Sequence, residues 1–324
     1  MRELILEMLR QEKHISGEEI GKRLKISRTA VWKHVNDLRK MGYEIQSSPK
    51  IGYTFKKSTN LLLPEEIEEG LNAQIMGKHI MHYDSISSTQ DIAAEMARMG
   101  AVEGTLVIAE TQDKGRGRKG RNWVSLPQGG IYLSLILRPN LMPAQVVQIP
   151  LIAGVALTKA IRETVSLQPM IKWPNDIIVG KKKVGGILTE MSSEIDGVNY
   201  VILGIGLNVN MPASLFDENI SDIATSLIDQ CGKNTSRVKL VQNFLCEFEL
   251  FYEKFLTDGF TSIRDEWKGL NNTIGSPVKI TDGITSIEGE ALDIDNDGFL
   301  LVRKENGDIS RIISGDVSLR NSVR

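Results

Sequence analysis

A run of glycines and cations at residues 115–123 is the feature of the sequence best suited to binding an anion. Three glycines alternate there with three arginines and one lysine, and a tryptophan ends the run. These like charges repel one another unless an anion lies among them, and glycine lets backbone N–H groups turn toward a ligand without side-chain obstruction. The run is therefore predicted to be an anion-binding loop. Its members are Gly115, Arg116, Gly117, Arg118, Lys119, Gly120, Arg121, Asn122 and Trp123.

The glycine spacing of this loop also matches the G-x-G-x-x-G pattern of dinucleotide-binding proteins. That pattern requires a helix directly after the glycines. The loop is followed instead by a polar segment and by the alternating apolar run 131–137, which is typical of a strand. The dinucleotide and kinase interpretations are therefore excluded, and a basic surface turn remains the alternative to an anion site.

Further residues with chemical potential lie outside the loop. Lys172 and Lys183 are candidate cations, Trp123 is a candidate stacking surface, and Asn175 and Asp176 follow a strand break at a proline. The sequence has no G-x-x-x-x-G-K-[ST] motif, and its four histidines, at positions 14, 34, 79 and 82, are far from the loop in sequence. Such a set suits charge neutralisation and alignment, as when an ionised carboxylate attacks the α-phosphate of ATP.

Length and charge predict a multidomain protein with a basic amino-terminal part. The chain has 324 residues, of which 41% are apolar, and this is enough for two or three domains. Residues 1–60 hold 13 Lys and Arg against 7 Asp and Glu, which leaves 26 against 34 for the rest. A basic head on an acidic body suggests a nucleic-acid contact confined to the head. No signal peptide, membrane-spanning run or Cys/His cluster is apparent, so we expect a cytoplasmic protein that does not bind membranes.

Residues 1–60 are predicted to form a winged helix-turn-helix domain. Two helical segments precede a third, which Ser27 caps and which buries one apolar face. Two short strands, 43–46 and 52–55, then form a hairpin. Recognition helices of this kind read DNA in the major groove. The residues expected to contact DNA are Arg28, Thr29, Trp32, Lys33 and Asn36 on the exposed helix face, with Lys50 at the hairpin tip.

The remainder of the chain is predicted to form two domains after a linker near residues 57–65. The central domain, 61–268, alternates strand-like and helical segments, including an apolar helix at 148–161, which indicates a mixed-sheet α/β arrangement. Residues 269–324 contain short alternating strands at 278–281, 285–294, 299–303 and 309–313, typical of a small antiparallel SH3-like barrel. The fold class is therefore α+β, with three domains.

Four motifs of the central domain resemble the signatures of biotin protein ligases. They are the loop 115–121, KWPND at 172–176, KVGGIL at 183–188 and GIGLN at 204–208. With the winged helix in front of them, the whole chain resembles the bifunctional form that is both biotin ligase and biotin operon repressor. The central domain would then have a class II synthetase-like fold.

The resemblance implies a reaction in two steps. Biotin and ATP would give biotinyl-5′-adenylate and pyrophosphate, and biotin would then pass to a lysine of a carrier protein. Lys183 and Arg118 would be the catalytic residues, and Mg²⁺ would bind near Asp176. The expected biotin-binding set is Ser88, Thr89, Gln90, Gln112, Gly115, Arg116, Gly117, Arg118, Lys183, Gly186, Gly204 and Gly206, with Gln90 where the family commonly shows Asn. The expected ATP-binding set is Arg118, Arg121, Trp123, Asn175, Asp176 and Asn208.

The same resemblance implies the partners of the protein. They would be the biotin carboxyl carrier domain of a carboxylase, operator DNA and a second copy of the chain, with the adenylate as corepressor. Two alternatives stay open at this point. One is a lipoate or octanoate ligase of similar fold, and the other is a ligand-sensing repressor without catalytic activity.

Overall fold

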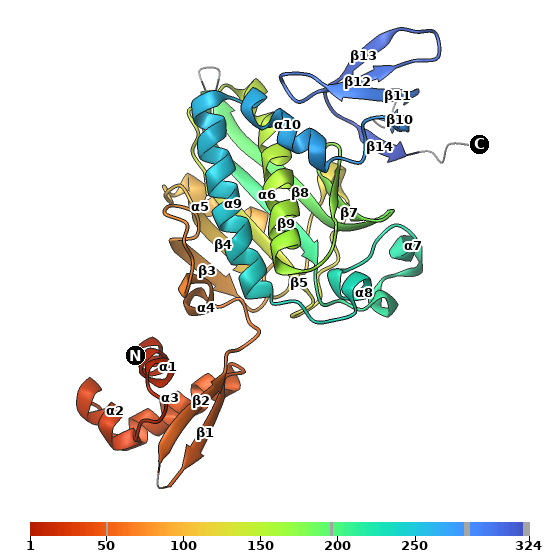
Figure 1. Ribbon diagram of the computed structural model, residues 1–324. Coiled ribbons are helices and arrows are strands. Elements are labelled where there is room, and N and C mark those ends of the chain that lie inside the picture. The colour runs from red at the N-terminus through yellow and green to blue at the C-terminus, as the bar shows by residue number, and fades with distance from the viewer. Residues whose placement is uncertain (50, 195–196, 282–285, 320–324) are drawn as a thin grey trace. The chain divides into compact units, whose positions relative to one another are not determined.

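The computed structural model describes residues 1–49, 51–194, 197–281 and 286–319, and its contacts divide the chain into two compact units (Figure 1). The first unit is Met1–Glu69 and the second is Gly70–Arg324. The division falls beyond residue 60, because Leu62 and Leu63 are buried and Leu63 belongs to the core of the first unit. The three domain ranges given by the sequence remain a prediction.

The first unit contains the predicted three helices and two-stranded wing. Ser16 and Ser27 cap the second and third helices, since their hydroxyls accept the backbone N–H groups of Glu19 and Ala30. The wing strands pair antiparallel. The elements are α1 (Arg2–Gln11), α2 (Gly17–Leu24), α3 (Arg28–Lys40), β1 (Glu44–Ser48), β2 (Gly52–Lys57) and α4 (Pro64–Glu68).

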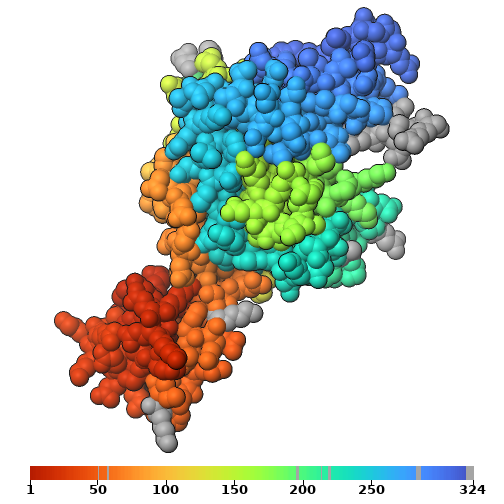
Figure 2. Space-filling model, viewed as in Figure 1, coloured from red at the N-terminus to blue at the C-terminus, as the bar shows by residue number. Residues whose placement is uncertain are grey.

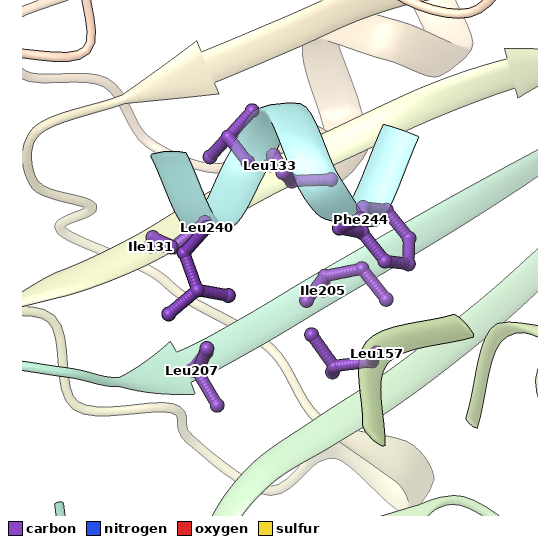
Figure 3. A pocket seen from close by; sticks show the side chains of 8 residues that line it. Ile131, Leu133, Leu157, Ile205, Leu207, Leu240 and Phe244 are labelled. Atoms are coloured by element: carbon purple, nitrogen blue, oxygen red, sulfur yellow. The ribbon is translucent and has the colours of Figure 1, made fainter. Parts of the chain in front are cut away.

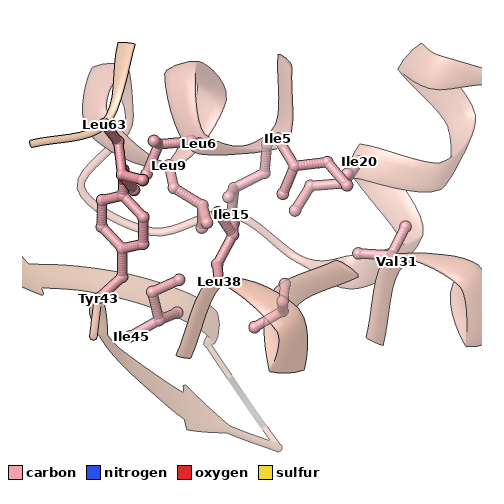
Figure 4. Close-up of a cluster of buried hydrophobic side chains, with 11 residues drawn as sticks. Ile5, Leu6, Leu9, Ile15, Ile20, Val31, Leu38, Tyr43, Ile45 and Leu63 are labelled. Atoms are coloured by element: carbon pink, nitrogen blue, oxygen red, sulfur yellow. The ribbon is translucent and has the colours of Figure 1, made fainter. Parts of the chain in front are cut away.

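A core of apolar side chains joins these helices to the wing (Figure 4). At Gly52, where φ is +90°, a Cβ atom would lie 2.3 Å from the carbonyl oxygen of Ile15, so the wing approaches the chain before α2 closely. The short helix α4 was missed by the sequence analysis, which expected only a linker there. Arg10 of α1 forms ion pairs with Glu66 and Glu69 at α4, and this contact was not visible in the local pattern.

The second unit is built on a mixed seven-stranded sheet in the order β3-β4-β5-β9-β8-β7-β6. Strands β3 and β4 pair parallel, and all other neighbours pair antiparallel. The strands are β3 (His79–Tyr83), β4 (Thr105–Ala109), β5 (Gly130–Leu137), β6 (Met170–Lys172), β7 (Asp176–Val179), β8 (Lys182–Glu194) and β9 (Gly197–Asn208). This arrangement confirms the predicted mixed-sheet α/β domain.

Helices cover both faces of this sheet. Helix α5 (Thr89–Arg98) packs on one face, where Ala93 and Ala97 contact Ile136 and Ile202 of the central strands. On the other face, α6 (Ile149–Thr164), α9 (Arg237–Asp258) and α10 (Thr261–Leu270) lie side by side, and their side chains form a continuous covering (Figure 2). Short helices complete the unit: η1 (Arg118–Gly120), η2 (Pro143–Gln148), η3 (Ala213–Leu215), α7 (Glu218–Ser221) and α8 (Leu227–Cys231).

The face beneath α6 and α9 is a closed apolar core. A small gap there is lined only by aliphatic and aromatic side chains from β5, β9 and the two helices (Figure 3). It offers no polar group to orient a ligand, so we assign it to packing. The lining residues are Ile131, Leu133, Leu157, Ile205, Leu207, Leu240, Val241 and Phe244.

The segment Pro143–Thr164, which joins η2 to α6, is long and apolar enough to cross a bilayer. However, 72% of its most apolar 18-residue stretch is buried inside the protein, where α6 packs on the sheet beside α9 and α10. This is the environment of a core helix, and it accounts for the apolar composition of the segment.

The carboxyl-terminal part of the second unit is a five-stranded antiparallel sheet in the order β13-β12-β11-β10-β14. Four of its strands were predicted, and the fifth, β14, was not. The predicted small antiparallel sheet is confirmed. The strands are β10 (Pro277–Thr281), β11 (Ser286–Ile294), β12 (Leu300–Arg303), β13 (Ile309–Ile312) and β14 (Asp316–Leu319).

Candidate active site

The glycine and cation loop joins β4 to β5, as predicted, and folds back on itself. The N–H of Gly117 donates to the carbonyl of Arg121, and the N–H of Trp123 donates to the carbonyl of Gly115. A Cβ atom on Gly115 would lie 2.7 Å from the Trp123 carbonyl oxygen, so only glycine permits this closure. The tip is the 3₁₀ turn η1, a short helical element in a segment expected to have none.

Arg116 connects the loop to two carboxylates. Its guanidinium lies 2.6 Å from Asp91 of α5 and 3.4 Å from Glu190 of β8. Partial burial lowers the pKa of Arg116, but the hydrogen bonds and charges of the two carboxylates more than offset this, so the pKa is raised. The first cation of the loop is therefore held firmly in its charged form.

Arg118 lies deeper than its neighbours. It donates 2.9 Å to Oδ1 of Asn175 and 3.3 Å to the carbonyl of Gly315 in the carboxyl-terminal sheet. Burial lowers the pKa of Arg118, although the charges of Asp316 and Asp176 partly oppose that effect. The structure thus brings together Arg118 and Asn175, two residues of the ATP-binding set expected from the sequence.

Lys119 and Arg121 both pair with one carboxylate, that of Asp316 at the start of β14. The Lys119 distance is 3.2 Å. From the sequence, the loop cations were expected to repel one another in the absence of a ligand anion. In the structure, carboxylates from α5, β8 and β14 neutralise them instead.

Trp123 and Lys183 meet over the glycines of β8 and β9. The Lys183 Nζ lies 5.5 Å from the centroid of the Trp123 ring and 2.6 Å from Oδ1 of Asp176. A Cβ atom on Gly206 would be 2.5 Å from the indole, and one on Gly186 would be 3.1 Å from both the indole and Lys183 Nζ. The sequence expectation was that these glycines leave room for a ligand. In the structure they make room for side chains of the site itself.

A single row of residues crosses the sheet beneath these groups. The strand registers place Lys172 opposite Asp176, Asp176 opposite Gly186, Gly186 opposite Gly206, and Gly206 opposite Tyr132. Residues directly opposite one another on neighbouring strands point to the same face. Neighbouring strands lie about 4.8 Å apart. The row therefore carries polar and glycine positions in a fixed order along one face of the sheet.

The start of α5 forms the other end of the site. The backbone N–H and the hydroxyl of Thr89 both donate to Oε1 of Gln112, at 2.8 and 3.0 Å. Ser88 occupies the N-cap position but makes no side-chain cap bond. Its hydroxyl is buried, and within the described part of the chain it has no hydrogen-bond partner. A buried hydroxyl without a partner is energetically costly unless a ligand or water satisfies it.

Gln90 is fully engaged within the protein. Its Nε2 donates 2.9 Å to Glu190, and its Oε1 accepts from Ser134 at 2.8 Å. A Cβ atom on Gly204 would lie 2.7 Å from Oε1 of Gln90, so this glycine accommodates the glutamine. Gln90 and Arg116 thereby share Glu190, and the polar start of α5 is linked to the cationic loop.

Two predicted residues lie differently from the rest. Asn208 is buried and donates to the carbonyl of Thr225, so its amide has a structural partner. Arg121 is 64% exposed and turns toward Asp316. The structure thus gathers most of the predicted biotin and ATP residues on one face of the sheet and at its loops, with these two at the margin.

Arg237, a fully buried arginine at the start of α9, was not predicted from the sequence. Its guanidinium lies 2.8 Å from Glu110, which follows β4, and donates 3.0 Å to the carbonyl of Gly130, which begins β5. These contacts tie together the two ends of the segment that carries the cationic loop. An isolated arginine in a helical pattern gives no local signal of such a role.

The exposed face of α3 is a second cationic surface, in the first unit. Arg28, Thr29, Trp32 and Lys33 are exposed, and Trp32 is 57% exposed despite its size. Within the described residues, neither Arg28 nor Lys33 has a salt-bridge partner. Asn36 is half-buried and accepts from Arg39. Lys50, predicted at the wing tip, lies outside the described residues.

Three family models match successive parts of the chain. They describe an HTH domain at residues 2–54, the biotin/lipoate A/B protein ligase family at 83–208 and the biotin protein ligase C-terminal domain at 273–320. The matched parts contain, in order, the exposed α3 face, most of the site and the sheet that carries Asp316.

Similar proteins span almost the whole chain. The bifunctional ligase/repressor BirA of Bacillus subtilis is 41% identical over 98% of both chains, and that of Escherichia coli is 30% identical over 95% of this chain and 94% of its own. Among solved structures, the biotin protein ligase of Aquifex aeolicus in complex with biotin and ATP superposes with a TM-score of 0.65. It is 32% identical and covers 76% of this chain and all of its own.

Proposed function

The chain belongs to the family of bifunctional biotin ligase/repressor proteins, and we propose that the site on the α5 face of its sheet forms biotinyl-5′-adenylate. The resemblance noted in the sequence is confirmed, as are the ligase activity class and the DNA-binding repressor half. The observation that carries the site assignment is the meeting of Lys183, Trp123 and Asp176 over the glycines of β8 and β9.

Biotin would bind with its ring system at the start of α5. The buried Ser88 hydroxyl can donate to or accept from the ureido group of biotin, and this would satisfy an atom that has no partner within the described part of the chain. Gln112 is already oriented by Thr89. The acyl chain would then run along the sheet toward Gly206 and Lys183. Gln90, held by Glu190 and Ser134, would bound the pocket rather than change partners.

The reaction needs charge stabilisation more than proton transfer. A carboxylate oxygen of biotin attacks the α-phosphorus of ATP, the bond from that phosphorus to the bridging oxygen breaks, and pyrophosphate leaves with the electron pair. Lys183 would stabilise the charge where carboxylate and phosphate meet. Arg118, already anchored by Asn175, would hold the adenylate phosphate. Preorganised cations of this kind lower the barrier because they do not need to reorient during the reaction.

Mg²⁺ would enter with the nucleotide. Within the described residues, no three His, Cys, Asp or Glu side chains form a metal-binding group. Mg²⁺ needs no such group, since it commonly binds through one or two carboxylates together with substrate phosphates. Asp176 is the carboxylate that would hold it, and the bound ion would supply further charge neutralisation at the phosphates.

In the second step, the amine of a carrier lysine attacks the carbonyl carbon of the adenylate, and AMP leaves. The carrier would be the biotin carboxyl carrier domain of a carboxylase, since relatives of this chain are named for acetyl-CoA-carboxylase. Loop cations that hold the adenylate phosphate would keep the intermediate in the site until the carrier arrives.

The exposed face of α3 would bind operator DNA. A single recognition helix makes few base contacts, so high specificity would require two copies on a two-fold operator. We therefore propose a homodimer that the adenylate favours, and by linkage the adenylate would then favour DNA binding equally. We also propose that the protein acts in the cytoplasm, where its carrier and its operator are found.

Pyrophosphate exchange into ATP tests the ligase assignment. The exchange should require biotin and should not be supported by lipoate or octanoate. Exchange with lipoate but not with biotin would identify the protein as a lipoate ligase. If none of these acids supports exchange, the protein would be a ligand-sensing repressor without catalytic activity. Titration of operator DNA at fixed salt, with and without biotin and ATP, tests the coupling. If the adenylate changes neither subunit association nor DNA affinity, the proposed coupling is wrong.

A further inference from the structure

Lys172 is a cation on the site face that begins the KWPND motif, and the proposed function assigns it no step of the reaction. It ends β6, the edge strand of the sheet, directly before the buried Trp173. Its neighbour Ile171 lies against the Gly154 position of α6, as a Cβ atom there would be 3.5 Å away. Successive side chains of a strand point to opposite faces. Lys172 therefore points to the face that carries Asp176, Gly186 and Gly206.

The surroundings of Lys172 are charged but leave its ammonium group without a direct partner. Within the described residues, the side chain of Lys172 has no hydrogen bond or salt bridge. Asp176, directly opposite in the register, forms its ion pair with Lys183. Burial lowers the pKa of Lys172, while the charge of Asp176 opposes this shift. A half-buried ammonium group without a direct partner is suited to bind an anion that arrives with the substrate.

The order of residues across the sheet indicates which part of the substrate that anion is. From the centre toward the edge, the row runs Gly206, Gly186, Asp176 and Lys172. Lys183 lies over Gly186, where carboxylate and α-phosphate would meet. In phosphoryl and nucleotidyl transfer, the attacking and leaving oxygens lie roughly in line. With biotin on the Gly206 side, the leaving group therefore departs toward the edge strand. Lys172 lies about two strand spacings, roughly 10 Å, beyond Gly186.

We propose that Lys172 binds the β- and γ-phosphates of ATP and stabilises pyrophosphate as it leaves. This inference rests on the proposed adenylation at the same site, and it assigns a catalytic residue to the leaving group. Lys183 would then stabilise charge at the bond that forms between the biotin carboxylate and the α-phosphorus. Lys172 would stabilise charge at the bond that breaks between the α-phosphorus and pyrophosphate. In the second step pyrophosphate has already gone, so Lys172 has no part in transfer to the carrier.

The test compares the two half-reactions in Lys172→Gln, Lys172→Arg and a matched control. Lys159→Gln removes one positive charge from α6, on the other face of the sheet. In biotin-dependent exchange, Lys172→Gln should raise the pyrophosphate concentration for half-maximal rate roughly ten- to a hundredfold, the loss expected for one charged hydrogen bond. Lys172→Arg should recover most of this, and Lys159→Gln should behave as wild type. Transfer of biotin from preformed adenylate to the carrier should be unchanged in all three.

The two half-reactions separate the possible results. If the pyrophosphate dependence of Lys172→Gln is that of wild type, or if transfer from the preformed adenylate falls in parallel with exchange, the inference is wrong. Lys172→Met, which keeps the apolar stem, replaces the glutamine variant should that variant fail to fold. Absence of biotin-dependent exchange in the wild-type protein would instead overturn the proposed function, and this inference with it.

Discussion

The two cationic surfaces of this protein differ in what neutralises them. On α3, Arg28 and Lys33 are exposed and, within the described residues, have no salt-bridge partners. In the loop 115–123, every cation has a partner from another element, and three of the four pair with carboxylates. Both surfaces are rich in arginine and lysine in sequence, so composition alone does not separate them.

The difference follows from how each surface would meet its anion. DNA brings a dense row of phosphates to a solvated helix face, and binding there is driven by release of counterions. The loop folds over a half-buried site, where unneutralised cations would be costly. Carboxylates of the protein therefore form ion pairs with the loop cations. When the substrate binds, its phosphates would replace these carboxylates or share the cations with them.

Replacing Lys183 by alanine should nearly abolish adenylation. Removing one preorganised charge from a reacting centre costs roughly a hundred- to a thousandfold in rate, and here it also leaves Asp176 without its ion-pair partner. Biotin-dependent pyrophosphate exchange measures the effect. Binding of ligand-free protein to DNA should be unchanged, since α3 lies in the other unit. Loss of DNA binding in this variant would mean that the two cationic surfaces are not independent.

Replacing Gly206 by alanine should lower the adenylation rate roughly ten- to a hundredfold. The new methyl group would lie 2.5 Å from the indole of Trp123, so the ring must move, and a displacement of about 1 Å in a positioned group costs up to a hundredfold. Gly269→Ala in α10, where no atom lies within 4 Å of the new Cβ, is the control. Equal adenylation rates for the two variants would show that the position of the Trp123 ring over Gly206 does not affect the reaction.

How much of this site was readable in the sequence depends on how local each feature is. The helix cap at Ser27, the strand break at Pro174 and the glycine loop are set by neighbouring residues, and all were predicted. The pairing of Arg121 with Asp316 joins residues 195 positions apart. No periodicity indicates such a contact. The same holds for the bond of Arg237 to both Glu110 and Gly130.

Strand register was the other feature that the sequence could not supply. Lys172, Asp176 and Gly186 were each recognised as candidate residues, but their alignment across three strands depends on pairings that include a bulge near Ile177. A shift of one residue would turn every side chain of a strand to the other face. The order from Gly206 to Lys172, on which the leaving-group inference depends, is therefore a structural observation.

Replacing Lys33 by alanine should weaken operator binding severalfold and flatten its salt dependence. A lost phosphate contact lowers the slope of log affinity against log salt by about 0.9. Pyrophosphate exchange should be unchanged, because Lys33 is exposed on α3 in the first unit and the site is built from residues of the second. DNA titrations at several salt concentrations give the slope. An unchanged slope would mean that the exposed cations of α3 do not contact phosphate.

The smallest expected effect, that of Asp316→Asn, tests the loop half of the contrast most directly. The substitution keeps the shape of the side chain and removes the charge that faces Lys119 and Arg121. Because Lys119 is 37% and Arg121 64% exposed, solvent screens both pairs, and each contributes about 0.2–1 kcal/mol. The loop should open more often, so trypsin should cleave within residues 116–121 about two- to tenfold faster in the ligand-free variant. Biotin with ATP should remove most of this difference, since phosphates replace the missing carboxylate.

Asp297→Asn is the matched control, because Asp297 pairs with Arg311 in the same sheet. If Asp316→Asn and Asp297→Asn are cleaved at the same rate, Asp316 does not restrain the loop, and its cations are neutralised by solvent as those of α3 are.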